Sequence, residues 1–245
     1  MLLLAIETAT RRQSVALLAE QTVLARSEED AEGSHAKKLI PAIDRLLAAN
    51  KLALRDLGGL AVSIGPGSFT GLRVGLATML AFRSVTGLPL AAVPTLEAMA
   101  WNVRGAAEAV CPMLRARTGE LYWALFQWRS GRLERLGEDH VGSPLMVARC
   151  IHGPTIALGD GWEAYSEEII RCLDPGAAIR AAPAEAMAAS AVSVGLAGLA
   201  MLERGEAAGA TISPRYIQRA EAELKWARER KQKEPQFRKP AMAKQ

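Results

Sequence analysis

The first half of the chain alternates short apolar runs with longer helical patterns. Leu2–Glu7, Ser14–Leu18 and Thr22–Ser27 are apolar runs separated by brief gaps. Because no crossover helix fits into those gaps, the runs predict an antiparallel three-stranded meander. Ser34–Asn50 then repeats apolar residues every three or four positions, as an amphipathic helix does. Pro41 lies inside that pattern and predicts a kink, or a helix that begins later than Ser34.

The stretch from Leu57 to Gly87 contains an apolar run, a glycine-rich loop and a mainly apolar helix. The apolar run predicts a central strand, the loop reads GPGSFTG at residues 65–71, and the helix is expected over Leu72–Val85. Leu88–Val93 predicts another strand and Thr95–Val103 another helix. The first half therefore has the order β-β-β-α-β-α-β-α.

The second half repeats that order. The expected elements are a meander, a short helix, a strand ending in Gly-Asp-Gly, a helix, a strand and an Ala-rich helix, over Ala109–Arg115, Glu120–Trp128, Arg132–Val141, Pro144–Cys150, Thr155–Leu158, Trp162–Cys172, Ala177–Ala182 and Ala184–Glu203. Two such copies are typical of a duplicated ribonuclease-H-like fold, an α/β fold whose two lobes each have a mixed sheet flanked by helices. We expect lobes over 1–104 and 105–213, and a basic, partly helical tail over 214–245.

The positive charge of the chain belongs to the tail. Net charge is +4, yet from Pro214 onward ten Lys and Arg stand against four Asp and Glu, so the preceding body is slightly acidic. Apolar residues of the tail recur at helical spacing and aromatic residues follow in the basic run, namely Tyr216, Ile217, Ala220 and Leu224, then Trp226 and Phe237. Such a mixture can bind RNA through phosphate contacts and base stacking. The interpretation that we favour is a docking helix followed by a solvated end.

Membrane and secreted classes do not fit the pattern. No apolar run approaches the roughly 18 residues of a membrane helix. The start, MLLLAIE, has no basic residue and is interrupted by Glu7, so it predicts a strand and not a signal peptide. Cys111, Cys150 and Cys172 are odd in number and widely spaced. They are expected to be reduced core residues of a cytoplasmic protein.

The glycine-rich loop leaves two interpretations open, a phosphate-binding loop and a tight strand-to-helix turn. Gly65, Gly67 and Gly71 permit tight bends and close approach, while Ser68 and Thr70 can cap the next helix. The N-terminal amides of that helix attract anions. The loop is neither a Walker A sequence, because Leu-Arg follows it where Lys-Ser/Thr is required, nor a complete GxGxxG.

The heptapeptide GPGSFTG followed by LRVG is far more specific than those generic patterns. It resembles the TsaB (YeaZ) family, the partner subunit of the bacterial machinery that makes threonylcarbamoyladenosine in tRNA. AIETAT, SHAKKLIPAIDRLLAA and VPTLEAMA also fit, so the resemblance covers about residues 1–104. It implies the actin-like (ASKHA) form of the fold and a non-catalytic subunit. The implied partners are a TsaD-like catalytic paralogue in a heterodimer, a TsaE-like ATPase and tRNA through the complex, with ATP used by the complex and self-pairing open to the isolated chain.

The resemblance also indicates where phosphates would lie. In ATPases of this superfamily two glycine-containing phosphate loops face each other across the cleft between the lobes. The candidates for a phosphate or nucleotide loop here are Thr8, Thr10, Gly65, Gly67, Ser68, Thr70, Gly71, Gly159, Asp160 and Gly161. The first loop normally carries Asp-x-Gly, whose carboxylate holds hydrated magnesium, but Glu7 and Ala9 stand there instead and would crowd a phosphate. A polar hairpin turn is therefore favoured over residues 7–10, and an active ATP-dependent kinase or phosphotransferase of the same fold is the alternative function.

Histidine spacing separates the chain from the catalytic paralogue, which binds metal with an HxxxH pair. His35, His140 and His152 are the three histidines, and no two are four apart. Since no cysteine cluster has ligand spacing either, we expect no metal site and no cofactor bound by this chain. No serine has a GxSxG setting, so no catalytic residue is expected.

Two helices predict a partner surface. Placed on a helix, Val74, Ala77, Ala81, Phe82 and Val85 form an apolar side suited to the sheet. Two leucines on the other side lie between arginines, like an apolar interface centre with a charged rim. The preceding helix has an apolar arc wider than sheet packing requires. The expected partner surface is Leu39, Ile43, Leu47, Arg73, Leu76, Leu80 and Arg83; cover by another helix of the same chain is the alternative.

Overall fold

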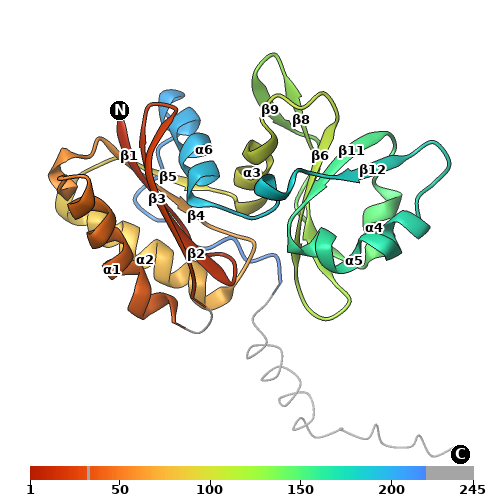
Figure 1. Cartoon of the computed structure of the whole chain (residues 1–245), viewed down its shortest axis with the longest axis horizontal. Coiled ribbons are helices and arrows are strands. Elements are labelled where there is room, and N and C mark those ends of the chain that lie inside the picture. The colour runs from red at the N-terminus through yellow and green to blue at the C-terminus, as the bar shows by residue number, and fades with distance from the viewer. Residues whose placement is uncertain (32–33, 219–245) are drawn as a thin grey trace, which may run out of the picture.

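A five-stranded sheet forms the centre of the first lobe in this computed structural model, which describes residues 1–31 and 34–218 (Figure 1). The antiparallel meander and the two parallel strands beside it give the order β3-β2-β1-β4-β5, with β1 Leu2–Glu7, β2 Arg12–Ala19, β3 Thr22–Asp30, β4 Gly59–Ser63 and β5 Leu90–Val93. All of β4 and nearly all of β1 are buried. Their continuous apolar runs suit strands that are covered on both faces.

Helices cover both faces of this sheet. α1 (His35–Ala49) and α2 (Phe69–Thr86) pack on one face, and α6 (Ala191–Glu203) packs on the other. α6 follows the second half in sequence but contacts β1, β2, β4 and β5 of the first lobe (Figure 1). A side chain at Gly198 would overlap Ala61 Cβ at 2.6 Å, so the small residues of α6 let it lie close to the sheet.

Pro41 is accommodated inside one continuous helix. α1 begins at His35, directly after Ser34. Pro41 therefore lies inside the helix and does not set where the helix begins. The carbonyl that Pro41 leaves without a donor is that of Lys37, and both residues face solvent. Water can therefore replace the missing hydrogen bond.

The second lobe has a branched sheet of seven strands. Its main path is β10-β7-β6-β11-β12, and β8 pairs with both β6 and β9; the strands are β6 Ala109–Arg115, β7 Leu121–Trp123, β8 Phe126–Arg129, β9 Arg132–Arg135, β10 His140–Gly142, β11 Pro154–Leu158 and β12 Ala178–Ala181. Each of the two long strands expected over Glu120–Trp128 and Arg132–Val141 is two short strands. They divide because β7 pairs with the end of β6 and β8 with its beginning, at Val110.

The helices of the second lobe are shorter. α4 (Pro144–Arg149) and α5 (Asp160–Arg171) pack on each other and cover one face of the sheet. α3 (Thr95–Ala100), from the first half of the chain, packs on β6 and covers the other face with the 3₁₀ turn η2 (Trp101–Val103). Another 3₁₀ turn, η1, spans Leu54–Asp56.

The lobes therefore exchange a helix. The expected boundary between residues 104 and 105 separates the two sheets. α3 precedes this boundary but packs on the sheet of the second lobe, and α6 follows it but packs on the sheet of the first lobe. The single helix expected over Ala184–Glu203 is a 3₁₀ turn, η3 (Ala184–Ala186), followed by α6. The amide of Asn102 donates to the carbonyl oxygens of Ala186 and Ala188, which would otherwise accept helical hydrogen bonds.

Residues 215–218, here called the interlobe segment, join the two lobes. The Arg215 N–H donates to the Ile64 carbonyl oxygen at 2.6 Å, and its guanidinium lies 3.2 Å from Asp139 of the second lobe. Gln218 accepts from the Tyr122 hydroxyl and donates to Glu120. This segment has no helix. The other tail residues that carried the helix and RNA predictions, Ala220, Leu224, Trp226 and Phe237, lie outside the described residues.

Candidate functional site at the glycine loop

Glu7 ends β1 as a fully buried carboxylate. It accepts hydrogen bonds from the Ala9 N–H, from the Thr10 hydroxyl at 3.1 Å and from the Ser63 hydroxyl at 3.3 Å. Burial raises the pKa of Glu7 to about 7, because the three hydrogen bonds offset only part of the lost hydration. The carboxylate is therefore engaged by its own chain.

Ser63 is a site residue that sequence patterns missed. It is the last residue of β4, which pairs in parallel with β1 so that Val62 lies opposite Ile6. The next positions, Ser63 and Glu7, are consequently neighbours at the carboxyl edge of the sheet. The parallel pairing of the two buried apolar runs is the feature that indicates a contact between Ser63 and Glu7. No motif around Ser63 does so.

The glycine loop lies directly on the backbone that follows Glu7. The Ser68 N–H donates to the Ala9 carbonyl oxygen at 2.6 Å. A Cβ at Gly67 would lie 2.3 Å from that same oxygen, and one at Gly71 would lie 2.0 Å from the Thr8 carbonyl oxygen. These glycines thus allow two backbone segments to touch. The first-loop candidates Thr8 and Thr10 and the glycine-loop candidates are brought together as one packed unit.

The remaining loop candidates have structural contacts of their own. The Ser68 hydroxyl accepts from the Gly71 N–H at 3.2 Å, so Ser68 caps α2 as expected, while Thr70 is exposed. Gly65, whose φ is +114°, lies against the Arg215 carbonyl. Thr8 is fully buried against Gly75, and its hydroxyl has no partner among the described residues.

The Gly-Asp-Gly segment occupies the corresponding place in the second lobe. Gly159 has a φ of +102°, and a Cβ there would lie 2.0 Å from the Met113 carbonyl oxygen. The Asp160 carboxylate accepts from the Arg115 N–H at 2.9 Å, and burial raises its pKa from the ordinary value. A Cβ at Gly161 would touch Met113 as well. Gly159, Asp160 and Gly161 are thus held by contacts within the second lobe. Among the described residues, no hydrogen bond joins them to Thr8 or Thr10.

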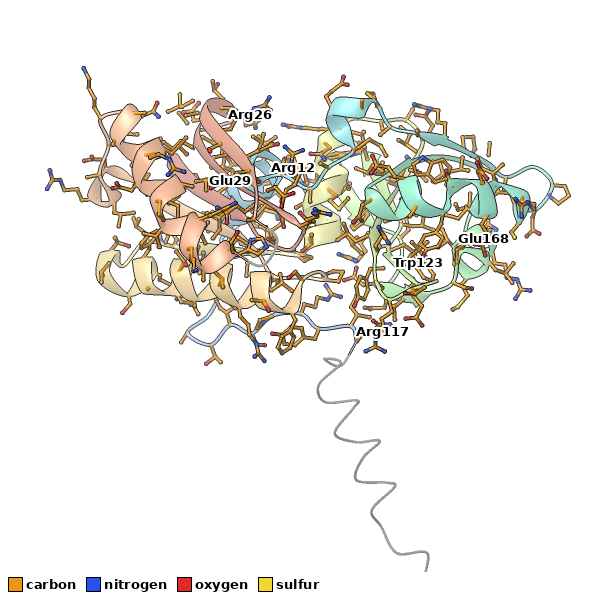
Figure 2. The ribbon with its side chains drawn as sticks, turned by 60° about the horizontal axis from the view of Figure 1, so that its bottom comes forward. Arg12, Arg26, Glu29, Arg117, Trp123 and Glu168 are labelled. Carbon is orange, nitrogen blue, oxygen red and sulfur yellow. The ribbon has the colours of Figure 1, made fainter. Side chains whose placement is uncertain are left out.

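A basic cleft of about 580 Å³ lies between the lobes. Its walls are glycine-loop residues 66–69, the β6–β7 turn and the interlobe segment, and it is lined by Arg115, Arg117 and Arg215. Figure 2 shows Arg117 at the edge of the second lobe, near the last described residues. Arg215 is paired with Asp139 and Glu138, so the acids of the second lobe neutralise part of the charge.

The expected partner surface is mostly internal. Leu39, Ile43, Leu47 and Leu76 are buried in the core between the sheet and its two helices, and Leu80 packs against the same core. Leu76 is 4% exposed, whereas Val85, which was expected to face the sheet, is 78% exposed. Ala77 and Ala81 are exposed on the same side of α2 as Arg73. The inward side of α2 carries Gly71 and Gly75, which bring the helix against Thr8 and so fix its rotation.

The described part of the chain has no metal-binding cluster, and its cysteines form no disulfide. No group of three His, Cys, Asp or Glu side chains there could hold a metal ion. Cys111, Cys150 and Cys172 are free thiols. His35 is buried, and loss of hydration lowers its pKa. None of the described helices is both long enough and apolar enough to cross a membrane.

Comparison with known proteins identifies relatives along most of the chain. The TsaD family model, described as tRNA N6-adenosine threonylcarbamoyltransferase, matches residues 27–226. The tRNA threonylcarbamoyladenosine biosynthesis protein TsaB of Bacillus subtilis is 30% identical over 236 residues, which are 94% of this chain and 100% of that protein. The structure of YeaZ from Pseudomonas aeruginosa has a TM-score of 0.74 at 28% identity, over 88% of this chain and 99% of that one.

A more distant likeness concerns the fold alone. A ROK family protein from Streptococcus pneumoniae, solved in complex with sucrose, has a TM-score of 0.52 at 10% identity. The match covers 84% of this chain and 99% of that one. The expected two-lobed, actin-like α/β fold is confirmed by these structures.

Proposed function

This chain belongs to the TsaB family, and from that premise we propose that it is a non-catalytic partner subunit in the synthesis of threonylcarbamoyladenosine in tRNA. The family resemblance that the motifs indicated is confirmed. The chemistry would belong to a TsaD-like paralogue, which transfers threonylcarbamoyl to the adenosine beside the anticodon. A TsaE-like ATPase and tRNA join through the complex, which uses the ATP.

The state of Glu7 is the observation that carries this proposal. A carboxylate that holds hydrated magnesium in a phosphate loop needs free lone pairs and open space beside it. Glu7 is fully buried, and its oxygens already accept from Ala9, Thr10 and Ser63. The glycine loop covers the next two residues through the Ser68–Ala9 hydrogen bond. Both features favour a structural role for the loop at residues 7–10 over ATP chemistry.

An active kinase or phosphotransferase of the same fold is the second candidate. The likeness to a ROK family protein favours it, but that likeness concerns fold alone. We expect the purified chain to hydrolyse ATP no faster than the buffer background. Robust turnover that Glu7→Gln abolishes would establish the kinase function and overturn the proposal.

The partner surface is proposed on the exposed sides of α1 and α2. α2 presents Ala77, Ala81 and Val85 there, and α1 presents Ile40 and Pro41. Val85 and Ile40 are large apolar side chains at 78% and 48% exposure, which a partner could cover. Arg73 lies on the same side of α2 and would belong to the rim. An isolated chain could use this surface to pair with itself.

Ala81→Arg tests this placement because Ala81 is exposed and its replacement leaves the core intact. We expect a folded chain with unchanged thermal stability that no longer co-elutes with its TsaD-like partner and no longer supports tRNA modification. Ala164→Arg is the matched control, since Ala164 is an exposed alanine on α5 of the other lobe. Normal binding by Ala81→Arg would move the interface elsewhere, and loss of binding in both variants would remove the argument for α2.

A further inference from the structure

A cavity of about 800 Å³ lies in the second lobe and away from the glycine loop. It opens where the sheet branches, between the starts of β6 and β11, strand β8, the β9–β10 turn and the end of α4. Its volume is in the range of small-molecule sites. None of the residues assigned above to the glycine loop, the Gly-Asp-Gly segment or α2 lines it.

The walls of the cavity are mainly apolar. Leu125, Leu136 and Pro154 contribute aliphatic surface, and the Leu136 N–H donates to the Leu125 carbonyl oxygen, which joins these two walls. His140 pairs across the strands with Trp123, and their rings stack with centroids 5.3 Å apart at 26°. The indole is only 1% exposed while His140 is exposed, so the imidazole presents an open ring face beside the cavity. A flat ring fits such a wall.

A buried hydrogen-bond donor at this cavity has no partner. Trp123 lines the cavity within the second lobe (Figure 2), and among the described residues nothing accepts from its Nε1–H. A buried indole N–H normally finds an acceptor, because leaving it unpaired loses the hydrogen bond that it makes in water. This N–H is enclosed by the protein, so a ligand in the cavity contacts the Trp123–His140 pair through the exposed imidazole and not through the indole N–H.

The charges at the cavity favour an acceptor. Glu108 is paired with Arg180 at 2.6 Å, and Glu138 lies 3.8 Å from Arg215. Arg149 lines the same cavity, and within the described chain it has no ion-pair partner. The acids are thus paired with arginines, while the Arg149 guanidinium remains available. The complementary ligand carries a negative charge and an apolar body.

From these contacts we propose that the cavity binds a small aromatic carboxylate. Its ring lies between Leu136 and the open face of His140, and its carboxylate accepts hydrogen bonds from Arg149. An unpaired guanidinium lines the cavity, and a carboxylate is the acceptor that fits a guanidinium through two parallel hydrogen bonds. A metal ligand is not indicated, since the described residues hold no suitable cluster.

Calorimetric titration of the full chain with naphthoate tests the proposal, and neutral naphthamide is the matched ligand. We expect naphthoate to bind at least about tenfold more tightly than naphthamide, because the hydrogen bonds to a charged acceptor are lost in the amide. Arg149→Gln should weaken naphthoate by about tenfold and leave naphthamide unchanged. No detectable naphthoate binding, or equal binding of the two ligands, would overturn the proposal.

Leu136→Glu tests the location without touching the buried indole. Leu136 is 47% exposed at the cavity wall, so a glutamate there keeps the fold and repels the carboxylate. Leu145→Glu is the matched control, because Leu145 is 40% exposed on α4 and does not line the cavity. Loss of naphthoate binding in the first variant alone supports the site. Equal effects of both variants, or none in either, show that naphthoate binds elsewhere and contradict the assignment.

Discussion

The two lobes share one arrangement of parallel strands and helices, but their acids, Glu7 and Asp160, lie at different positions in it. In the first lobe β1, β4 and β5 run parallel in that order, and in the second lobe β6, β11 and β12 do the same. α2 follows β4 as α5 follows β11. The acid of the first lobe, Glu7, ends its central strand, whereas Asp160 begins a helix and binds the backbone of Arg115.

Both lobes use glycine for the same purpose. Gly71 lies against the Thr8 carbonyl oxygen and Gly159 against the Met113 carbonyl oxygen, and in both cases a Cβ would come within 2.0 Å of that oxygen. The carbonyls belong to the equivalent region, at the carboxyl end of the first buried strand. A glycine-rich loop in this fold can therefore be required by backbone packing alone, with no phosphate to bind.

The largest expected effect is a loss of stability when a methyl group is added at these close backbone contacts. Gly71→Ala and Gly159→Ala should each lower the free energy of unfolding by about 3 kcal/mol or more, because a rigid backbone must move to admit the methyl group. Urea unfolding at one pH measures it. Gly153→Ala is the control, since nothing lies within 4 Å of its Cβ position. A stable Gly71→Ala variant would leave phosphate binding as the reason for glycine in the first lobe.

The buried acid of the first lobe predicts a pH dependence. Glu7 has a pKa of about 7 in the folded chain against 4.5 for an unperturbed carboxyl. Between those values the folded state holds a proton that the unfolded state releases, so the free energy of unfolding falls as pH rises through this window. The full shift corresponds to about 3 kcal/mol at most. Glu7→Gln should therefore be more stable than the parent at about pH 8 and similar at about pH 5.

His35 provides the internal control for that experiment. Burial lowers its pKa, so the unfolded state binds the extra proton and stability rises with pH below about 6.5. This trend is opposite in sign to that of Glu7 and is present in both proteins. The difference between parent and Glu7→Gln therefore isolates the carboxyl. Parallel stability curves for the two proteins would mean that Glu7 is charged at neutral pH in the folded state.

The helix exchange between lobes predicts a more local effect. Gly198→Val should lower the free energy of unfolding by about 2 kcal/mol, because the Cβ meets the methyl groups of Ala61 and Ala91, which cannot move aside. Hydrogen exchange should accelerate in β1 and β4 and stay unchanged in β11. Glu203→Ala, at an exposed position of the same helix, should change neither. Faster exchange in β11 would assign α6 to the second lobe instead.

Much of this architecture could be predicted from the sequence, and the failures have physical causes. The order of strands and helices follows from runs and periods, and the family follows from GPGSFTG. The rotation of α2 could not be predicted, because a periodicity of apolar residues ignores Gly71 and Gly75, which form the inward side. Arg215 has no local signal at all, since its partners Ile64 and Asp139 are distant in sequence. Contacts made by backbone and by distant residues are invisible to local patterns.

The smallest expected effect concerns the segment that holds the two lobes in one arrangement. Tyr216 stacks on Phe69 with ring centroids 4.9 Å apart, and Arg73 donates to its hydroxyl at 2.9 Å. Tyr216 is 39% exposed, so Tyr216→Ala should cost only about 1 kcal/mol of unfolding free energy. A double-mutant cycle with Phe69→Ala should give a coupling of about 0.5–1.5 kcal/mol, since either change alone removes the stack. Tyr216→Phe separates the contributions, because it keeps the ring and loses the hydrogen bond from Arg73. A coupling of zero would mean that the Tyr216–Phe69 stack does not help to hold the interlobe segment, which would then be held by the contacts of Arg215 and Gln218.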